Sequence, residues 1–166
     1  MPAGAIGEGY CMPLSVQRVV ECVHEAAKNQ ERLVIIAGRP GSGKSKIMRE
    51  LSTMRGWRYL DCKAFVTHEL MDLTPKARAE EAPHLIFKFI ESLRAETVLL
   101  DGLQVLFAPV LHLAPLELLR QLSRKQTIVA AWPGEYQDGK LIFSYTGYET
   151  AQKQYAVENC QVIQIG

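Results

Sequence analysis

The chain has 166 residues, 48% of them hydrophobic, and its 19 basic and 18 acidic side chains leave a formal net charge of +1. This length and apolar content are typical of one globular domain, so we expect a single domain over residues 1–166. The balanced charge argues against a protein dominated by non-specific nucleic-acid binding, although a local DNA contact stays possible. The sequence contains no apolar run of about 18 residues, so no membrane span is predicted.

The N-terminal third predicts a lead-in, a helix and a strand. Residues 1–12 contain three glycines and predict a flexible lead-in. Apolar residues recur near helical spacing over 14–29, which predicts an N-terminal helix. The apolar run 33–37 then predicts a buried strand, and it opens an expected nucleotide-binding core over 33–165.

The most informative segment follows this strand directly. Residues 38–45 read Gly-Arg-Pro-Gly-Ser-Gly-Lys-Ser, a complete GxxxxGKS phosphate-binding loop. Its glycines let backbone N–H groups approach phosphate oxygens, and a helix expected over 44–54 adds the positive end of its dipole. We therefore predict a nucleoside triphosphate site made by Gly38, Arg39, Pro40, Gly41, Ser42, Gly43, Lys44, Ser45 and Lys46.

Two side chains of this loop have expected chemical roles. Lys44 should reach the β and γ phosphates, and the hydroxyl of Ser45 should coordinate Mg²⁺. Because Lys44 is expected to lie in a solvated loop, its replacement by alanine should remove triphosphate binding and leave the fold intact. No Asn-Lys-x-Asp tetrapeptide for guanine recognition is present, which favours ATP over GTP.

A second strand-end residue completes the predicted metal site. Residues 57–61 predict a second strand, and mainly helical segments follow to about residue 93, with breaks expected at Pro75 and Pro83. The apolar run 97–101 ends in Asp101, which a parallel sheet would place beside the phosphates as a catalytic and Mg²⁺-binding carboxylate. Many ATPases of this layout carry a Glu next, which activates water, but this chain has Gly102.

The C-terminal third predicts further alternation of helix and strand. Residues 110–124 predict a leucine-rich helix that is interrupted or kinked near Pro115, and 127–131 predict a buried strand. A short exposed strand is expected over 140–145, after an Asp-Gly turn, and a last strand over 160–165. Strands separated by helices predict a three-layer α/β/α sandwich, the P-loop NTPase fold, with a mainly parallel sheet of about five strands.

This part of the chain also carries two distinctive segments, VLLDGLQVLF at 98–107 and LSRKQTIVAAWPGEYQDGKLIFSYTGYETAQKQY at 122–155. Together with the loop, they resemble the BrxF family, the small P-loop ATP-binding proteins of type III BREX phage-defence systems. The turn Ala-Ala-Trp-Pro-Gly-Glu-Tyr, with its following hairpin, is the most specific element of this resemblance. The family often carries Asn where this chain has Gly102.

The resemblance implies a cytoplasmic protein that works with other BREX components, including a large ATPase, a methyltransferase and a phosphatase-like protein. It also implies a sheet in which one strand separates the loop strand from the Asp101 strand. Self-association on nucleotide binding would fit such a component. The four cysteines have no metal-ligand or redox spacing, which agrees with reduced thiols in the cytoplasm.

Three further residues are candidates for the site. In ATPases of this layout, the strand between the two motif strands ends facing the γ phosphate, so Glu135, just beyond it, is a candidate general base, although exposed loop glutamates are usually only solvated. Trp132 either stacks on a base or partner or packs beside its proline, and packing is favoured. Arg124 is a candidate arginine finger toward a neighbouring subunit, weighed against a solvated helix end that complements the macrodipole.

Three classes of function remain after these predictions. The favoured class is an ATPase or ATP-dependent switch with slow hydrolysis. The second is a small-molecule kinase, which needs a lid of paired arginines such as Arg120 and Arg124. The third is an adaptor that binds nucleotide without hydrolysis, for which Gly102 is the supporting residue.

Overall fold

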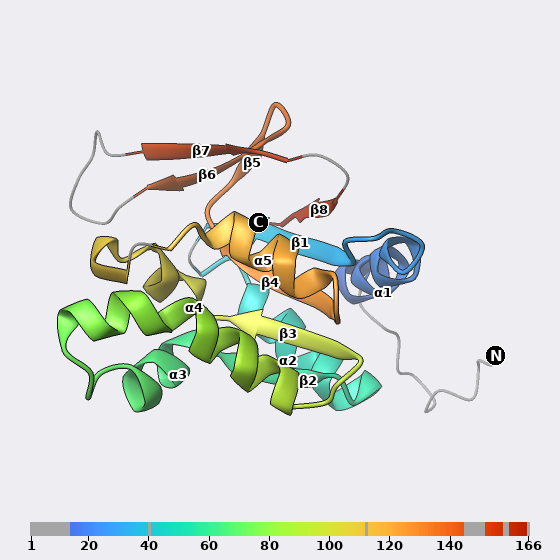
Figure 1. Cartoon of the computed structure of the whole chain (residues 1–166). Coiled ribbons are helices and arrows are strands. Elements are labelled where there is room, and N and C mark those ends of the chain that lie inside the picture. Colours follow the sequence, from blue (N-terminus) through green and yellow to red (C-terminus); the bar gives the residue numbers. More distant parts are fainter. Residues whose placement is uncertain (1–13, 40, 112, 145–151, 158–159, 166) are drawn as a thin grey trace.

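The structure, a computed structural model, describes residues 14–39, 41–111, 113–144, 152–157 and 160–165, so the predicted lead-in over 1–12 lies outside the described residues. Helices and strands alternate along the chain (Figure 1). The helices are α1 (Leu14–Ala26), α2 (Lys44–Arg55), α3 (Cys62–Glu69), α4 (Pro75–Ser92), α5 (Pro115–Ser123) and the 3-10 helices η2 (Leu103–Phe107) and η3 (Pro109–Leu111). The strands are β1 (Leu33–Gly38), β2 (Arg58–Asp61), β3 (Thr97–Asp101), β4 (Thr127–Pro133), β5 (Tyr136–Gln137), β6 (Lys140–Ser144), β7 (Gln152–Ala156) and β8 (Gln161–Gln164).

Five parallel strands form the main sheet in the order β2-β3-β4-β1-β8. This confirms the predicted parallel sheet of about five strands. A single strand, β4, lies between β1 and β3, as the resemblance implied. All carboxyl ends of the parallel strands therefore meet at one edge, where β1 leads into the loop and β3 ends at Asp101.

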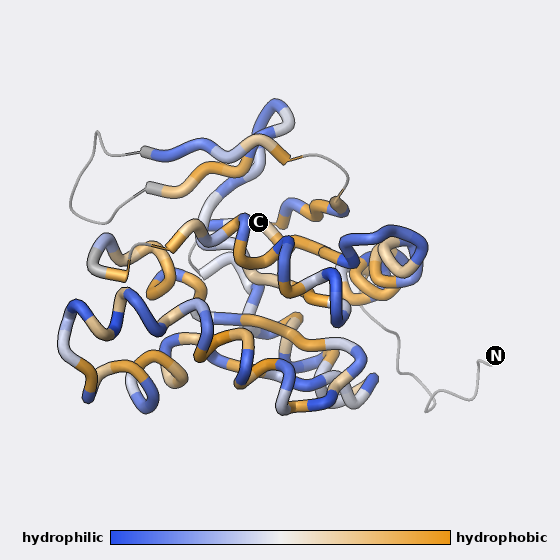
Figure 2. The backbone as a smooth tube through the Cα atoms, viewed as in Figure 1, coloured by the Kyte–Doolittle hydropathy of each residue, from blue (hydrophilic) through white to orange (hydrophobic). Residues whose placement is uncertain are grey.

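Helices cover both faces of this sheet, which confirms the three-layer sandwich (Figure 1). On one face, buried residues of α1 and α2 pack against alternate residues of the strands, such as Ile36 and Leu99. On the other face, α3, α4 and α5 pack against the residues between them, such as Ile35 and Leu100. Figure 2 shows the central strands as mainly hydrophobic segments, between helices in which hydrophilic and hydrophobic residues alternate. All six residues of β1 are buried, as a strand covered on both sides requires.

Of the two breaks predicted in the helical segments before residue 93, the one at Pro75 is confirmed, because α4 begins there, and the one at Pro83 is wrong. Helix α4 continues through Pro83, because its buried residues Ala82, Ile86 and Ile90 pack on the sheet and outweigh the lost backbone hydrogen bond. The helix predicted over 110–124 is interrupted before Pro115, which begins α5 at the first-turn position where its missing N–H costs nothing. The N-terminal helix also ends at Ala26, three residues before its predicted end.

A second sheet, of the antiparallel strands β5-β6-β7, lies beyond the main sheet (Figure 1). The predicted Asp-Gly turn joins β5 to β6, with positive φ at both Asp138 and Gly139. Strand β7 was not predicted. None of the helices in the described ranges has the length and apolarity to cross a membrane.

Aromatic contacts join the small sheet to the core. Trp132, at the end of β4, is fully buried and makes edge-to-face contacts with Phe107 and Tyr155. Its indole Nε1 donates a hydrogen bond to the carbonyl of Ile142 in β6 at 3.1 Å. Trp132 is therefore the packing aromatic that was favoured, and it is not available to stack on a base or a partner.

Candidate nucleotide site

The loop between β1 and α2 has the backbone that phosphate binding requires. Gly41 and Gly43 have φ values of 82° and 103°, in the left-handed region, and Gly43 is the N-cap of α2. A Cβ at either would meet nothing within 4 Å, so glycine is needed here for its conformation. Gly38 is needed for space, because its Cβ would lie 2.9 Å from the carbonyl oxygen of Ile165. The predicted Pro40 lies outside the described residues.

Lys44 is buried, so the expectation that it lies in a solvated loop was wrong. Its Nζ donates hydrogen bonds to the carbonyl oxygens of Gly38 and of Arg39, the latter at 2.9 Å. Burial lowers the pKa of the Lys44 ammonium, and the carboxylate of Asp101 partly opposes this shift. The loop therefore carries a desolvated positive charge at the start of α2, where an anionic ligand gains most from it.

Asp101, at the carboxyl end of β3, is linked to α2 as predicted for a shared metal site. The Ser45 hydroxyl donates to Asp101 Oδ2 at 2.7 Å, and the Gly102 N–H donates to Oδ1 at 2.9 Å. A hydroxyl and a carboxylate are hard oxygen ligands, so this pair fits Mg²⁺. Mg²⁺ bound here would neutralise charge on the β and γ phosphates of a nucleotide.

A cleft of about 320 Å³ opens above these groups, and its volume falls at the small end of the range for ligand sites. It joins the loop, the end of β3, the end of β4 and η2. Its lining residues are Gly41, Gly43, Lys44, Ser45, Lys46, Asp101, Gln104, Ala131 and Pro133.

Two residues of this site were missed by the sequence analysis. Tyr59, in β2, donates its hydroxyl hydrogen to Asp101 Oδ2 at 2.8 Å. Gln104, in η2, is exposed and lines the cleft. Neither belongs to a motif. The only available signal was their position: Tyr59 lies near the end of a predicted strand, and Gln104 follows Asp101 by three residues.

Gly102 is required by its surroundings. Its φ is 67°, and a Cβ on it would lie 2.3 Å from Asp61 Oδ1 and 3.2 Å from the Lys63 nitrogen. Asp61 is the N-cap of α3, and its Oδ1 accepts a hydrogen bond from that same nitrogen at 2.9 Å. A glutamate at position 102 would therefore displace this cap and adopt an unfavourable left-handed backbone, which explains why glycine stands where the usual Glu is absent.

Glu135 lies beside the loop, where the sequence analysis expected a candidate base. Its Oε1 is 3.4 Å from Arg39 Nε, in a pair whose arginine side chain is 78% exposed and whose glutamate is 33% exposed. The Gly38 N–H donates to the carbonyl of Gly134 at 2.7 Å, which brings the chain before Glu135 against the loop. Its role as a base stays a prediction, and it requires the Arg39 pair to open.

Arg124 lies near the amino-terminal ends of the parallel strands, whereas the loop lies at their carboxyl ends. Its Nη2 is 2.8 Å from Glu31 Oε2, and Arg120 Nη1 is 3.0 Å from Glu31 Oε1, just before β1 begins. Arg124 therefore does not face the loop of its own chain, and its action on a neighbouring subunit stays a prediction. The same placement means that Arg120 and Arg124 do not form the lid over the loop that a kinase would need.

The Glu31 cluster gives a stability prediction. Burial by itself would raise the pKa of Glu31, but hydrogen bonds from Arg124 and Arg120 outweigh it and hold the pKa below the ordinary 4.5. A carboxylate with a lowered folded pKa stabilises the protein above pH 4.5, and this stability is lost as the pH falls through the folded value. We expect Glu31→Gln to lower the free energy of unfolding by about 1 kcal/mol at pH 7.

Urea unfolding at pH 7 and pH 3 tests this prediction. The difference in the free energy of unfolding between the variant and the wild type should be smaller at pH 3. Glu25→Gln is the matched control, because Glu25 pairs with Lys28 through side chains that are 61% and 74% exposed. Glu25→Gln should change the free energy of unfolding little at either pH. An equal loss for Glu31→Gln at both pH values would contradict the prediction.

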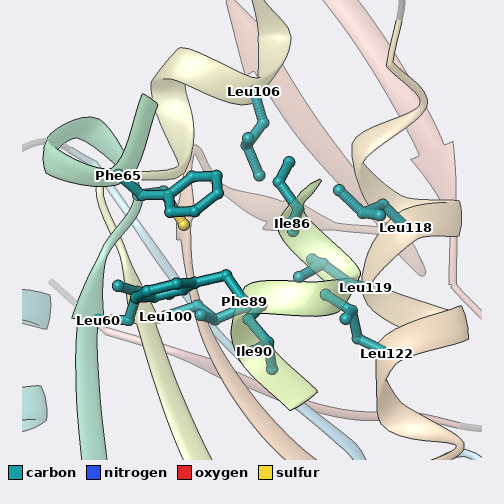
Figure 3. Close-up of a pocket in the computed structure, with 11 residues that line it drawn as sticks. Leu60, Phe65, Ile86, Phe89, Ile90, Leu100, Leu106, Leu118, Leu119 and Leu122 are labelled. Atoms are coloured by element: carbon teal, nitrogen blue, oxygen red, sulfur yellow. The ribbon is translucent and has the colours of Figure 1, made fainter. Parts of the chain in front are cut away.

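An apolar pocket between the sheet and helices α3, α4 and α5 is part of the core. Figure 3 shows its walls, where Phe65, Phe89, Leu100 and Leu119 point toward one another. Its volume of about 10 Å³ is at the lower limit for a single water molecule. This pocket is packing space, and the cleft lined by the 41–46 loop and Asp101 lies elsewhere, at the carboxyl edge of the sheet.

The comparisons with known proteins find a likeness among solved structures. No family model matches the chain, and no curated protein matches it. Among solved structures, C. elegans PCH-2 is similar at 17% sequence identity with a TM-score of 0.41, over 90% of this chain and 41% of that one. The chain thus spans less than half the length of PCH-2. Its own strand order and the glycine loop before α2 give it the P-loop NTPase fold.

Proposed function

We propose that the chain binds ATP with Mg²⁺ in the cleft over the 38–46 loop and hydrolyses it slowly, as a component governed by its nucleotide state. The observation that carries this proposal is the 2.7 Å hydrogen bond between Ser45 and Asp101, beside the buried ammonium of Lys44. This hydrogen bond joins segments 56 residues apart in the sequence, and its two oxygen-bearing side chains line the same cleft as Lys44, which supports binding of both phosphate and Mg²⁺ there.

Each group has a defined task in this proposal. The backbone N–H groups at the start of α2 bind phosphate oxygens, and Gly41 and Gly43 allow the loop to present them. Lys44 leaves its carbonyl partners in the loop and donates to the β and γ phosphates instead. The Ser45 hydroxyl and the Asp101 carboxylate would hold Mg²⁺, which would neutralise charge on the β and γ phosphates.

Slow hydrolysis follows from the position after Asp101. Position 102 is a glycine at which a Cβ would collide with the Asp61 carboxylate, so no carboxylate next to Asp101 is present to take a proton from water. Glu135 is held by Arg39, and the neutral amide of Gln104 can orient a water molecule but not deprotonate it at neutral pH. The chain therefore needs a rearrangement at Arg39, a second copy, or a partner to hydrolyse ATP quickly.

The test measures ATP binding and phosphate release by purified protein, each with and without Mg²⁺ and DNA, together with the mass in solution. We expect Mg²⁺-dependent binding and turnover far below one per second. Turnover of tens per second by the monomer would refute slow intrinsic hydrolysis. Tight binding without any phosphate release would favour the adaptor, the second candidate, which the geometry of Gly102 supports.

We also propose that this ATPase serves a BREX phage-defence system in the cytoplasm, as a BrxF protein. The support is the resemblance of residues 98–107 and 122–155 to that family, and the second segment forms most of the small sheet. Its partners would be other BREX proteins, including the large BREX ATPase. Co-expression with that ATPase, followed by size-exclusion chromatography with and without ATP, tests this. A complex that ATP does not affect, or no complex, would count against nucleotide-governed assembly.

A further inference from the structure

The Asp101 carboxylate receives hydrogen bonds from three separate parts of the chain. Its Oδ2 accepts from the Ser45 hydroxyl of α2 at 2.7 Å and from the Tyr59 hydroxyl of β2 at 2.8 Å. Its Oδ1 accepts from the backbone N–H of Gly102 at 2.9 Å. Of these donors, Tyr59 is the one that belongs neither to the phosphate-binding loop nor to the strand end that carries Asp101.

The sheet places Tyr59 for this contact. Strands β2 and β3 are paired in parallel with Asp61 opposite Asp101, so Tyr59 lies two residues before the edge on the neighbouring strand. Its ring packs on the sheet face that α2 covers, whereas the next residue, Leu60, packs on the other face. The long side chain therefore lies under α2, and its hydroxyl reaches the same carboxylate oxygen as Ser45.

We propose that Tyr59 is a positioning residue for the magnesium site, a role that rests on the proposed binding of Mg²⁺ and ATP. Ser45 must turn its oxygen toward the metal, so it fixes Asp101 only in part. Tyr59 keeps its ring packed and holds Oδ2 in one orientation before and after the metal enters. A carboxylate that is already oriented loses less conformational freedom on binding, and outer partners of this kind contribute strongly to metal affinity.

The test is Tyr59→Phe, which removes one hydroxyl and keeps the ring. Equilibrium binding of a fluorescent ATP analogue is measured across a Mg²⁺ titration and in EDTA. We expect the Mg²⁺ concentration for half-maximal enhancement of binding to rise about tenfold. Affinity in EDTA should stay within about twofold of the wild type, because the loop and Lys44 are unchanged. Tyr136→Phe, a hydroxyl removal in β5, is the matched control and should leave both values unchanged.

A double variant separates positioning from a general structural effect. If Tyr59 acts through Asp101, adding Tyr59→Phe to Asp101→Ala should cause no further rise in the Mg²⁺ requirement. A further tenfold rise in that background would overturn the inference. So would an unchanged Mg²⁺ requirement in Tyr59→Phe alone, or an equal loss of affinity with and without Mg²⁺. Urea unfolding without nucleotide shows whether Tyr59→Phe is folded, and Asp101→Asn, which keeps the shape of the side chain that accepts from Tyr59, must raise the Mg²⁺ requirement at least as much as Tyr59→Phe.

The outcome also separates this inference from the proposed function. If the wild type binds the analogue but Mg²⁺ does not alter binding, the magnesium part of the proposed function fails, and the role of Tyr59 fails with it. If the wild type depends on Mg²⁺ and Tyr59→Phe has the same dependence, only the inference about Tyr59 fails.

Discussion

Replacing Lys44 with alanine is expected to weaken ATP binding by about 100-fold or more, since truncating a buried charge that pairs with an anionic ligand costs about 3 kcal/mol or more. The reason lies in the desolvation of this ammonium, which strengthens its attraction to phosphate oxygens. Isothermal titration calorimetry with ATP and Mg²⁺ measures the effect directly. If the wild type self-associates with ATP, the Lys44→Ala variant should no longer show that ATP-dependent increase of its mass in solution.

The same variant tests what Lys44 contributes to stability. Its hydrogen bonds to the Gly38 and Arg39 carbonyls are lost, but burial of its charge is relieved and the carbonyls open to water in the cleft. We expect the free energy of unfolding without nucleotide to change by less than about 1 kcal/mol. Lys28→Ala, on the exposed end after α1, removes the same charge and should leave ATP binding unchanged. An unfolded Lys44→Ala protein would show instead that Lys44 is a structural residue.

Introducing the usual glutamate, by Gly102→Glu, is expected to destabilise the protein by about 2 to 3 kcal/mol and not to raise ATP turnover. About 1 to 2 kcal/mol comes from the left-handed backbone, and about 1 kcal/mol comes from displacing the Asp61 cap of α3. Urea unfolding and single-turnover phosphate release are the measurements. A stable Gly102→Glu variant with fast turnover would show that the missing base alone limits hydrolysis.

Gly139→Ala is the matched control for this substitution. Gly139 has a φ of 76°, close to that of Gly102, but a Cβ there would meet nothing within 4 Å. Gly139→Ala should therefore lower the free energy of unfolding only by the conformational part, about 1 to 2 kcal/mol. Equal losses at the two positions would mean that the contact between position 102 and the Asp61 cap has no energetic consequence.

Local patterns in the sequence predicted the main elements of the fold correctly. The apolar runs before Gly38 and Asp101 became β1 and β3, because fully buried parallel strands need continuous hydrophobic residues. Helix α2 begins at the predicted residue 44 and ends one residue after the predicted residue 54, between the caps Gly43 and Gly56. The predictions of where proline breaks a helix were less accurate. Pro83 was read as a break, but the burial of α4 on the sheet outweighed its local cost.

The small sheet shows why the rest was harder to predict. Its hairpin was found from the Asp-Gly turn, whose positive φ angles are a local requirement. Strand β7 has a polar sequence, and it forms because β6 pairs with it and because Tyr155 contacts Trp132 in the core. No local pattern encodes such a pairing.

The sequence by itself determined that a phosphate-binding loop joins a buried strand to a helix, and that a carboxylate ends a second strand, because spacing and hydrophobic runs are local properties. Only the tertiary structure decided which distant groups meet there. In the fold, the Tyr59 hydroxyl donates a hydrogen bond to Asp101, and Arg39 forms an ion pair with Glu135. Arg124 forms an ion pair with Glu31, at the end of the sheet away from the loop. The physical reason is that strand order and register fix these contacts, and both depend on the packing of the whole chain.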